Sequence, residues 1–155
     1  LMGERSPVND TNARGTFIGM TMDTTRADLV QAVLEGVAFA IRDSVEVARS
    51  LGIEINSSKI CGGGAKSPLW KRIFANVLSS ELEVPVSEQG PGMGGAMLAM
   101  VACGEYETVK ECCEKLCAVA STVKPEPELV AKYEVRYQQF RKIYPACKHL
   151  FAELM

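Results

Sequence analysis

The chain has 155 residues, of which 47% are hydrophobic and 23% are charged, a composition typical of one globular domain with a substantial core. Its formal net charge of −2 at pH 7 provides no basic surface of the kind that binds nucleic acid or anionic lipid. Because no apolar run reaches the roughly 18 residues of a membrane-spanning helix and the first residues lack a signal-peptide pattern, we expect a cytoplasmic protein without nucleic-acid or membrane partners.

Residues 1–16 are polar and rich in turn-forming residues, which predicts a loop. A short strand is predicted at residues 16–21. Thr25 and Asp28 then have the spacing of a capping box with Asp in place of the usual Glu, so a long helix is predicted from here to Gly52. Its expected apolar face consists of Leu29, Val33, Leu34, Gly36, Val37, Ala40, Ile41 and Val45.

The most informative segment is residues 59–70, where a short apolar stretch breaks into three glycines and restarts as a helix. Ser67 and Pro68 predict the N-cap and first turn of that helix, and Trp70 is interpreted as a packing residue. The expected buried stripe is Leu69, Ile73, Val77 and Leu78. Such a turn lets backbone N–H groups face a nucleotide, but glycine also serves tight turns for geometry alone. The residues by themselves leave these two interpretations about equal.

Residues 82–86 predict a brief strand in which Pro85 requires an edge or an end position. A second glycine cluster at residues 90–95 precedes a small-residue, Met-rich helix predicted at 96–103. Residues 108–119 follow a purely helical pattern. After a stiff break at residues 124–127, one last long helix carries an aromatic stripe that we interpret as core, formed by Tyr133, Tyr137, Phe140 and Tyr144.

The cysteines show no spacing typical of a metal site. They are Cys61, Cys103, Cys112, Cys113, Cys117 and Cys147, and no Cys-x-x-Cys pair occurs among them. We expect reduced, mostly buried thiols and no bound metal at these positions. The single histidine, His149, is interpreted as a surface or packing residue rather than a base.

Two glycine patterns approach known nucleotide-binding motifs. A P-loop needs glycine at the positions of Ile60 and Ala65, so no Walker A motif exists here. Gly90, Gly92 and Gly95 do satisfy G-x-G-x-x-G after a strand. A dinucleotide fold also needs a further strand ending in an acidic residue about 20 positions on, where this sequence looks helical. We therefore do not expect a Rossmann fold.

Two stretches resemble the second signature of the FGGY carbohydrate kinases: Gly15-Thr16-Phe17-Ile18-Gly19-Met20 and, seven residues later, Asp28-Leu29-Val30-Gln31-Ala32-Val33-Leu34-Glu35-Gly36. The segment Gly3-Glu4-Arg5-Ser6-Pro7, with Asp10 and Arg14, is similar to the xylulose kinase branch of that family, and so is the run from Gly62 to Trp70. The arrangement of Tyr133, Tyr137, Tyr144 and Pro145 also fits. The resemblance covers essentially the whole chain.

This resemblance implies an α/β fold that is part of an actin-like, ribonuclease-H-like ATPase domain, helix-rich with a small incomplete sheet. Residues 1–155 would form a single domain, the C-terminal domain of such a kinase without its N-terminal part. An adenine and ribose pocket is implied at the glycine run. The implied ATP-binding residues are Gly62, Gly63, Gly64, Ala65, Lys66, Ser67 and Pro68. A bulky residue at position 64 is expected to fill that pocket.

The resemblance also implies that sugar binding, the general-base aspartate and the first phosphate-binding loop belong to a preceding domain. Phosphoryl transfer from ATP with Mg²⁺ needs a base oriented toward the accepting hydroxyl, so we expect no kinase activity from this chain alone and assign it no catalytic or metal-binding residue. A sheet of three short strands would have an unpaired edge, which predicts a homodimer or a partner chain wrapped along that edge.

The implied function is that of the ATP-binding C-terminal part of a sugar kinase that phosphorylates D-xylulose to xylulose 5-phosphate. Two alternatives stay open: the same domain of an FGGY kinase for another sugar, and a non-catalytic α/β interaction or regulatory module. Arg5, Asp10 and Arg14 have two interpretations of equal weight, because loop side chains can reach a cleft or anchor the loop.

Overall fold

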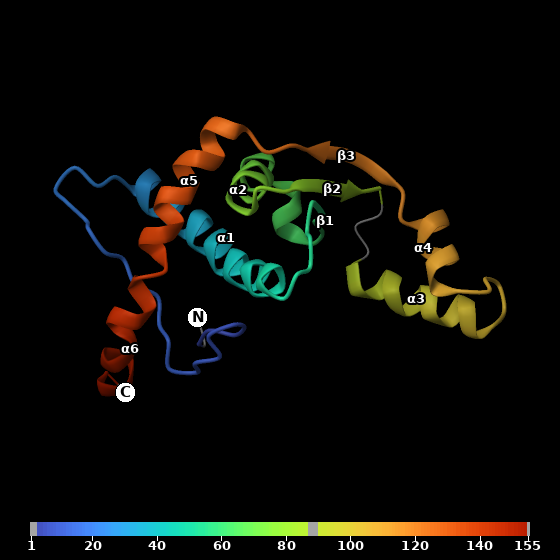
Figure 1. Cartoon of the computed structure of the whole chain (residues 1–155), viewed down its shortest axis with the longest axis horizontal. Helices are drawn as coiled ribbons and strands as arrows, with labels where there is room; N and C mark the ends of the chain where they lie inside the picture. Colours follow the sequence, from blue (N-terminus) through green and yellow to red (C-terminus); the bar gives the residue numbers. More distant parts are fainter. Residues whose placement is uncertain (1–2, 87–89, 155) are drawn as a thin grey trace.

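The structure, a computed structural model, describes residues 3–86 and 90–154 (Figure 1). The helices in this part are α1 (Arg26–Ser50), α2 (Pro68–Leu78), α3 (Gly90–Ala102), α4 (Val109–Leu116), α5 (Pro127–Phe140) and α6 (Ile143–Glu153). The strands are β1 (Ser57–Lys59), β2 (Glu81–Pro85) and β3 (Val119–Val123), and a short 3-10 helix, η1, covers Gly63–Lys66. The expected architecture, many helices around a small sheet, is confirmed.

The three strands form one mixed sheet in the order β1-β2-β3. β1 pairs with β2 in parallel, with Ser57 opposite Glu81, and β2 pairs with β3 antiparallel, with Leu82 opposite Val123. Pro85 is the last residue of the central strand, which confirms its predicted end position. In the described sheet β1 and β3 are the outer strands, so each has one side without a strand partner.

Helix α1 begins at the predicted capping box. The Thr25 hydroxyl accepts a hydrogen bond from the Asp28 N–H at 3.2 Å, and the Asp28 carboxylate accepts one from the Thr25 N–H at 2.8 Å. The helix ends at Ser50, and Gly52 follows with a φ of +81°. Both predicted ends are therefore confirmed. They could be predicted from the sequence because local hydrogen bonds and backbone conformation decide them.

The buried face of α1 differs from the predicted apolar face. The buried side chains are Glu35, Ala38, Phe39 and Arg42. Val33, Val37 and Ile41 are instead 51%, 42% and 47% exposed. Tertiary contacts cause this rotation, since Glu35 and Arg42 both find oppositely charged partners on α5.

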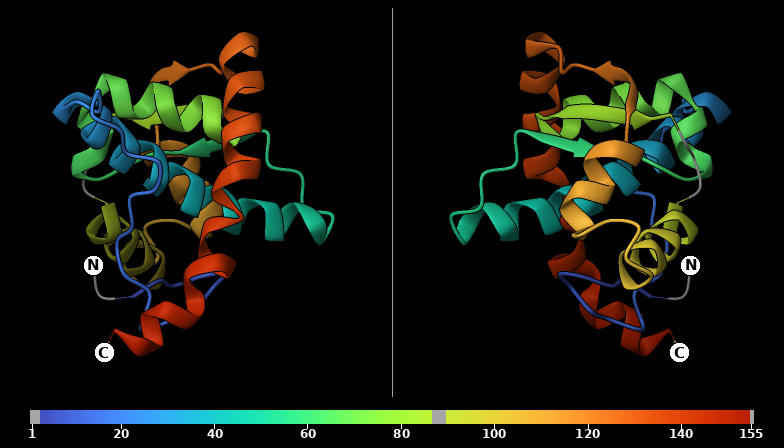
Figure 2. Two further views of the ribbon diagram at one scale, coloured as in Figure 1. Left: turned by 90° about the vertical axis from the view of Figure 1, so that its left-hand side faces the viewer. Right: turned by 90° about the vertical axis from the view of Figure 1, so that its right-hand side faces the viewer.

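The core lies where α1, α2 and α5 meet. Its buried residues are Ala38, Phe39, Ile73, Val77, Tyr133 and Tyr137. The Phe39 ring packs against Tyr133, Tyr137 and Phe140, with ring centroids 6.1, 6.0 and 5.3 Å away. These three aromatic residues therefore form core, as predicted. Figure 2 shows α5 crossing the other two helices of this cluster steeply.

The last predicted helix is in fact two helices. α5 ends at Phe140 and α6 begins at Ile143, so Tyr144 belongs to α6. Pro145 explains the break, because proline has no N–H for the carbonyl four residues earlier and its ring crowds that turn. Tyr144 is half-buried and donates a hydrogen bond to Asp10 Oδ2 at 2.8 Å. It anchors the N-terminal loop instead of extending the aromatic core.

The N-terminal segment is a loop, as predicted, and Glu4 pairs with Asp10 across it. The strand predicted at residues 16–21 is wrong. These residues form an irregular segment with a bend at Gly19, Phe17 is 50% and Ile18 63% exposed, and no described strand pairs with them. A strand needs a neighbour for its backbone groups, and the local sequence cannot provide one.

The sequence does not predict β3. Residues 108–119 are helical only as far as Leu116, and Val119 belongs to the strand. The β-branched residues Val119, Thr122 and Val123 suit a strand once β2 offers a partner. Because β3 runs antiparallel to β2, it does not provide the parallel unit of a Rossmann fold.

The second glycine cluster lies within a helix rather than before it. α3 already begins at Gly90 and ends at Ala102, while residues 87–89 lie outside the described part of the chain. α3 and α4 lie side by side (Figure 1), where Cys113 Sγ is 3.6 Å from Met97 Sδ. No helix among the described residues has the length and apolarity needed to cross a membrane.

The cysteines are all free, as expected. The expectation that most of them are buried is wrong, because only Cys112 is buried while Cys61 and Cys103 are exposed. Burial raises the pKa of the Cys112 thiol. His149 is exposed on α6, consistent with the surface role predicted for it.

Candidate functional site

The seven candidate residues, Gly62 to Pro68, connect the parallel strand β1 to α2, and we call them the glycine loop. The chain turns at Gly62 with φ of +90° and ψ of −179°, a combination that residues with a side chain avoid. The Ala65 N–H donates to the Gly62 carbonyl at 3.1 Å, and the Ser67 N–H donates to the Gly64 carbonyl at 3.1 Å. These hydrogen bonds give the loop its shape.

The glycine loop ends at the predicted N-cap of α2. The Ser67 hydroxyl accepts a hydrogen bond from the Trp70 N–H at 3.2 Å, and Pro68 is the first residue of the helix. Both predictions are confirmed. A serine hydroxyl suits the N-cap because it accepts a hydrogen bond from the first turn, and proline suits the first helical position because the N–H that it lacks would be unpaired there. The positive end of the α2 dipole therefore lies beside the loop.

The glycines of the loop have different surroundings. A Cβ added at Gly62 or Gly63 would meet no atom within 4 Å, so these two positions face open space. A Cβ added at Gly64 would lie 2.5 Å from Cζ3 and 2.7 Å from Cε3 of Trp70. The expectation that bulk at Gly64 would fill a pocket is therefore wrong, because a side chain there collides with the indole. Ala65 is buried, with 4% of its surface exposed.

An apolar hollow lies at Leu69, the residue after the glycine loop, and contains no residue of the loop itself. It is lined by Arg26, Ala27, Val30, Gln31, Leu34 and Leu69. Leu69 directly follows Pro68, and the Leu34 carbonyl accepts a hydrogen bond from Trp70 Nε1 at 3.2 Å. Leu69 was predicted in the buried stripe of α2, yet it is 51% exposed at this hollow. The other three residues of that stripe are buried as predicted.

The sequence pattern does not reveal the part that α1 contributes to this region. Leu34 belongs to the predicted apolar face of α1, whereas Val30 lies outside it. The pattern also does not reveal which helix face meets the start of α2, because that depends on the crossing of the two helices. The contact between Trp70 and the Leu34 carbonyl joins residues 36 positions apart.

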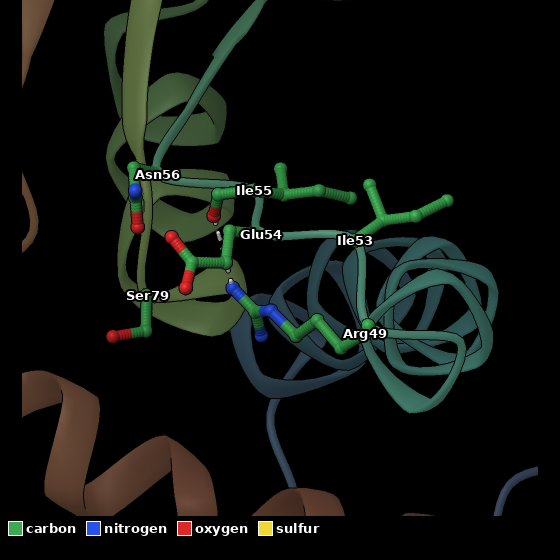
Figure 3. A pocket seen from close by; sticks show the side chains of 7 residues that line it. Arg49, Ile53, Glu54, Ile55, Asn56 and Ser79 are labelled. Atoms are coloured by element: carbon green, nitrogen blue, oxygen red, sulfur yellow. Dashed lines mark hydrogen bonds between the residues drawn. The ribbon is translucent and has the colours of Figure 1, made fainter.

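A separate hollow lies at the C-terminal end of α1 and contains no residue of the glycine loop (Figure 3). Arg49 reaches into it and donates from Nη2 to the Leu78 carbonyl at 2.8 Å and to Ser80 Oγ at 3.1 Å. The guanidinium also approaches the Ile55 carbonyl, as the dashed line in Figure 3 marks. Arg49 therefore fastens α1 to the end of α2, which is a structural role.

Two of the charged residues in the N-terminal loop act as anchors. Asp10 accepts hydrogen bonds from Tyr144 and from the Asn12 N–H, and these bonds hold the pKa of its carboxyl below the ordinary value. Arg14 Nη1 donates to the Thr11 carbonyl at 2.9 Å. Among residues 3–86 and 90–154, no three His, Cys, Asp or Glu side chains come together as a metal site.

Comparison with known sequences places these features in a family context. Residues 1–103 match the FGGY family of carbohydrate kinases, C-terminal domain. The xylulose kinase of Staphylococcus epidermidis is 37% identical over 155 residues, which are 100% of this chain and 31% of that protein. The ribulokinase of Halalkalibacterium halodurans is 38% identical over 144 residues, which cover 89% of this chain and 26% of that protein. The chain thus spans less than a third of the length of these curated relatives.

Solved structures show the same arrangement of elements. A "xyloylose kinase" from Brucella ovis matches with a TM-score of 0.85 and 37% identity over 96% of this chain and 31% of that one. The gluconate kinase from Lactobacillus acidophilus matches with a TM-score of 0.90 over 99% of this chain and 31% of that one, at 23% identity, which shows the fold alone. The expected fold class, part of an actin-like ATPase domain, is confirmed.

Proposed function

Because the chain belongs to the FGGY family of carbohydrate kinases, we propose that it forms the ATP-binding part of the C-terminal domain of a sugar kinase. The observation that carries this proposal is that the family match over residues 1–103 includes the whole glycine loop. We further propose that residues 1–155 act as one domain. In a complete kinase as long as these relatives, the rest of the protein would supply the sugar site and the catalytic base.

The geometry of the glycine loop supports a nucleotide site. A Cβ built at Gly62 or Gly63 would have no atom within 4 Å, so a ligand can approach the backbone of these two glycines closely. The N-terminus of α2 adds a partial positive charge that favours a phosphate or another anion. Lys66 is exposed in the same loop. In this proposal Gly63, Gly64 and Ala65 line the adenine and ribose pocket, while the apolar hollow beside Leu69 provides a surface for a flat base.

The sugar proposed for the complete kinase is D-xylulose, which would be phosphorylated to xylulose 5-phosphate. Relatives at 33–37% identity over at least 93% of this chain include xylulose kinases from Staphylococcus, Bacillus and Escherichia. A ribulose substrate is the second candidate, because ribulokinases reach 34–38% identity. Mg²⁺ would be held mainly through the nucleotide phosphates, as this cation is in kinase sites.

We also propose that this chain alone transfers no phosphate, that the protein is cytoplasmic, and that the free edges of the sheet favour a homodimer. A sheet edge with unpaired backbone groups is a template for pairing with another chain. Phosphorylation of xylulose with residues 1–155 as the sole protein would refute the first of these proposals. Light scattering tests the proposed homodimer, and a monomer at all concentrations would refute it.

Calorimetric titration of the chain with ATP tests the nucleotide site. Gly63→Trp is the blocking variant, because a Cβ at position 63 would meet no atom within 4 Å and a large side chain there would cover the loop surface. Ser50→Trp is the matched control, since Ser50 is exposed and lies about 24 Å along α1 from Leu34. We expect ATP binding in the parent chain and in the control, and its loss in Gly63→Trp.

A chimera tests the sugar assignment. In it, these 155 residues replace the 155 residues that they match in the S. epidermidis xylulose kinase. ATP-dependent phosphorylation of D-xylulose by the chimera, abolished by Gly63→Trp, supports a kinase domain. A folded chimera without nucleotide binding would instead favour a non-catalytic interaction module. The preference of the chimera comes from the sugar site of its host, so comparison with a ribulokinase host shows whether this chain serves both.

A further inference from the structure

We propose that Trp70 is a positioning residue for nucleotide binding, because its indole sets the distance between the glycine loop and α1. This inference rests on the proposed nucleotide-binding function. The sequence indicates only that Trp70 packs. Its contacts in the structure show what it packs against, and they link the loop to two helices.

The indole lies directly against the backbone of Gly64. A Cβ at position 64 would be 2.5 Å from Cζ3, 2.7 Å from Cε3 and 3.5 Å from Cη2 of Trp70. Carbon atoms in ordinary contact are about 3.5–4.0 Å apart, so any side chain at this position forces the indole or the loop to move. Gly64 has no positive φ. Close approach of the indole, rather than backbone conformation, is therefore the reason for glycine here.

The indole is held from its other side as well. Its Nε1–H donates to the Leu34 carbonyl of α1 at 3.2 Å, and its ring lies 5.6 Å from the Phe74 ring, centroid to centroid. The backbone N–H of Trp70 is bonded to the Ser67 hydroxyl, so the loop end and the indole belong to one local structure. Because the indole contacts Gly64, the Leu34 carbonyl and the Phe74 ring, any movement of it would cost packing or hydrogen-bond energy.

The internal hydrogen bonds of the loop do not provide this positioning. The bonds from Ala65 to Gly62 and from Ser67 to Gly64 remain within the loop and fix its shape. Placement relative to α1 and to the hollow at Leu34 instead depends on contacts that cross between elements. The indole makes such a contact, from Gly64 on one side to the Leu34 carbonyl on the other. A nucleotide that touches both the loop and the hollow needs this spacing to be correct.

A double-mutant cycle tests the inference in the 155-residue chain. The variants are Trp70→Phe, which removes the Nε1 donor and shortens the ring, Gly64→Ala, and the two combined. Phe151→Leu is the control for a loss of buried aromatic surface, because Phe151 is buried on α6 and outside the loop contacts. The melting temperature and the ATP dissociation constant are measured for each variant.

We expect Gly64→Ala to lower the melting temperature by about 4 °C or more in the parent chain and by less than half as much in the Trp70→Phe background. Trp70→Phe should raise the ATP dissociation constant about tenfold, while Phe151→Leu lowers the melting temperature without changing that constant. Trp70 is the single tryptophan of the chain, so its emission should also change when ATP binds. The same Trp70→Phe change in the chimera should raise KM for ATP more than it lowers kcat.

The outcomes separate this inference from the proposed function. Equal effects of Gly64→Ala in both backgrounds, or an unchanged ATP dissociation constant in Trp70→Phe, would overturn the positioning role while leaving nucleotide binding intact. Absence of ATP binding by both the parent chain and the chimera would overturn the proposed function, and the positioning role with it. Trp70→Phe and Phe151→Leu could instead raise the ATP dissociation constant by the same factor for the same loss of melting temperature. That result would mean that Trp70 contributes only stability.

Discussion

The carboxylate of Glu35 on α1 accepts a hydrogen bond from the Tyr133 hydroxyl of α5 at 3.1 Å, in the core of the protein. Arg136 donates to both Glu35 oxygens at 3.0 Å, and Gln31 donates to Oε1 at 2.7 Å. Glu35 is only 8% exposed, so these partners compensate for the loss of water around a buried charge. This cluster fastens α5 across α1.

Glu35→Ala should therefore destabilise the chain by about 2 kcal/mol, because it leaves the buried Tyr133 hydroxyl without its acceptor. Glu35→Gln keeps an acceptor at the same place and should cost less. Urea denaturation measures both, and an unchanged slope of the transition shows that the two states compared are the same. Equal stability of the Ala variant and the parent chain would show that the cluster does not hold the helices together.

Buried phenols predict how stability changes at alkaline pH. Burial, together with the negative charge of Glu35, raises the pKa of Tyr133 to about 12, and burial with the hydrogen bond to Asp43 raises the pKa of Tyr137 even further. The folded state holds these protons more tightly than the unfolded state, where the phenol pKa is about 10. The resulting stabilisation is complete below pH 10 and is lost as the pH rises through the folded-state values.

Absorbance titration of phenolate checks this directly. At about pH 11 the denatured chain should show nearly complete ionisation of its four tyrosines, and the folded chain should show about two fewer phenolates. The melting temperature should fall between about pH 10 and pH 12. Tyr133→Phe should make that fall less steep. Identical titration curves for the folded and denatured chains would contradict the prediction.

Neighbouring glycines of the loop should respond differently to alanine. Gly62→Ala requires a side chain at φ of +90° and should cost about 1–3 kcal/mol of stability. Gly63→Ala should change stability by less than about 0.5 kcal/mol, because its position is open and its backbone is not in that region. Chemical denaturation of this pair gives a matched comparison. Equal effects would mean that the turn at Gly62 is not required.

The capping box predicts a local effect at the start of α1. Thr25→Ala removes the hydroxyl that accepts from the Asp28 N–H and should cost about 1 kcal/mol. Thr16→Ala is the control, since Thr16 is an exposed loop threonine whose hydroxyl bond to the Arg14 carbonyl is long, at 3.4 Å. Thermal unfolding followed by circular dichroism compares the two. A larger effect at Thr16 than at Thr25 would contradict the assigned cap.

Much of the local structure was predictable because it depends on neighbours in the sequence. The cap of α1 is formed by residues three positions apart, and the N-cap of α2 likewise joins Ser67 to Trp70. The glycine loop and the family signature are contiguous patterns, so the site residues could be named without a fold. Their role in nucleotide binding stays a prediction that the titration above addresses.

Other features depended on residues that meet only in the folded chain. β3 needed β2 as its partner, and the buried face of α1 was decided by contacts of Glu35 with Tyr133 and Arg136, which are 98 and 101 positions away. The sequence by itself thus determined both ends of α1, the start of α2, the glycine loop and the family, since short-range hydrogen bonds and contiguous motifs encode them. Only the tertiary structure decided which helix faces are buried and why residue 64 is glycine, because these follow from how distant elements pack.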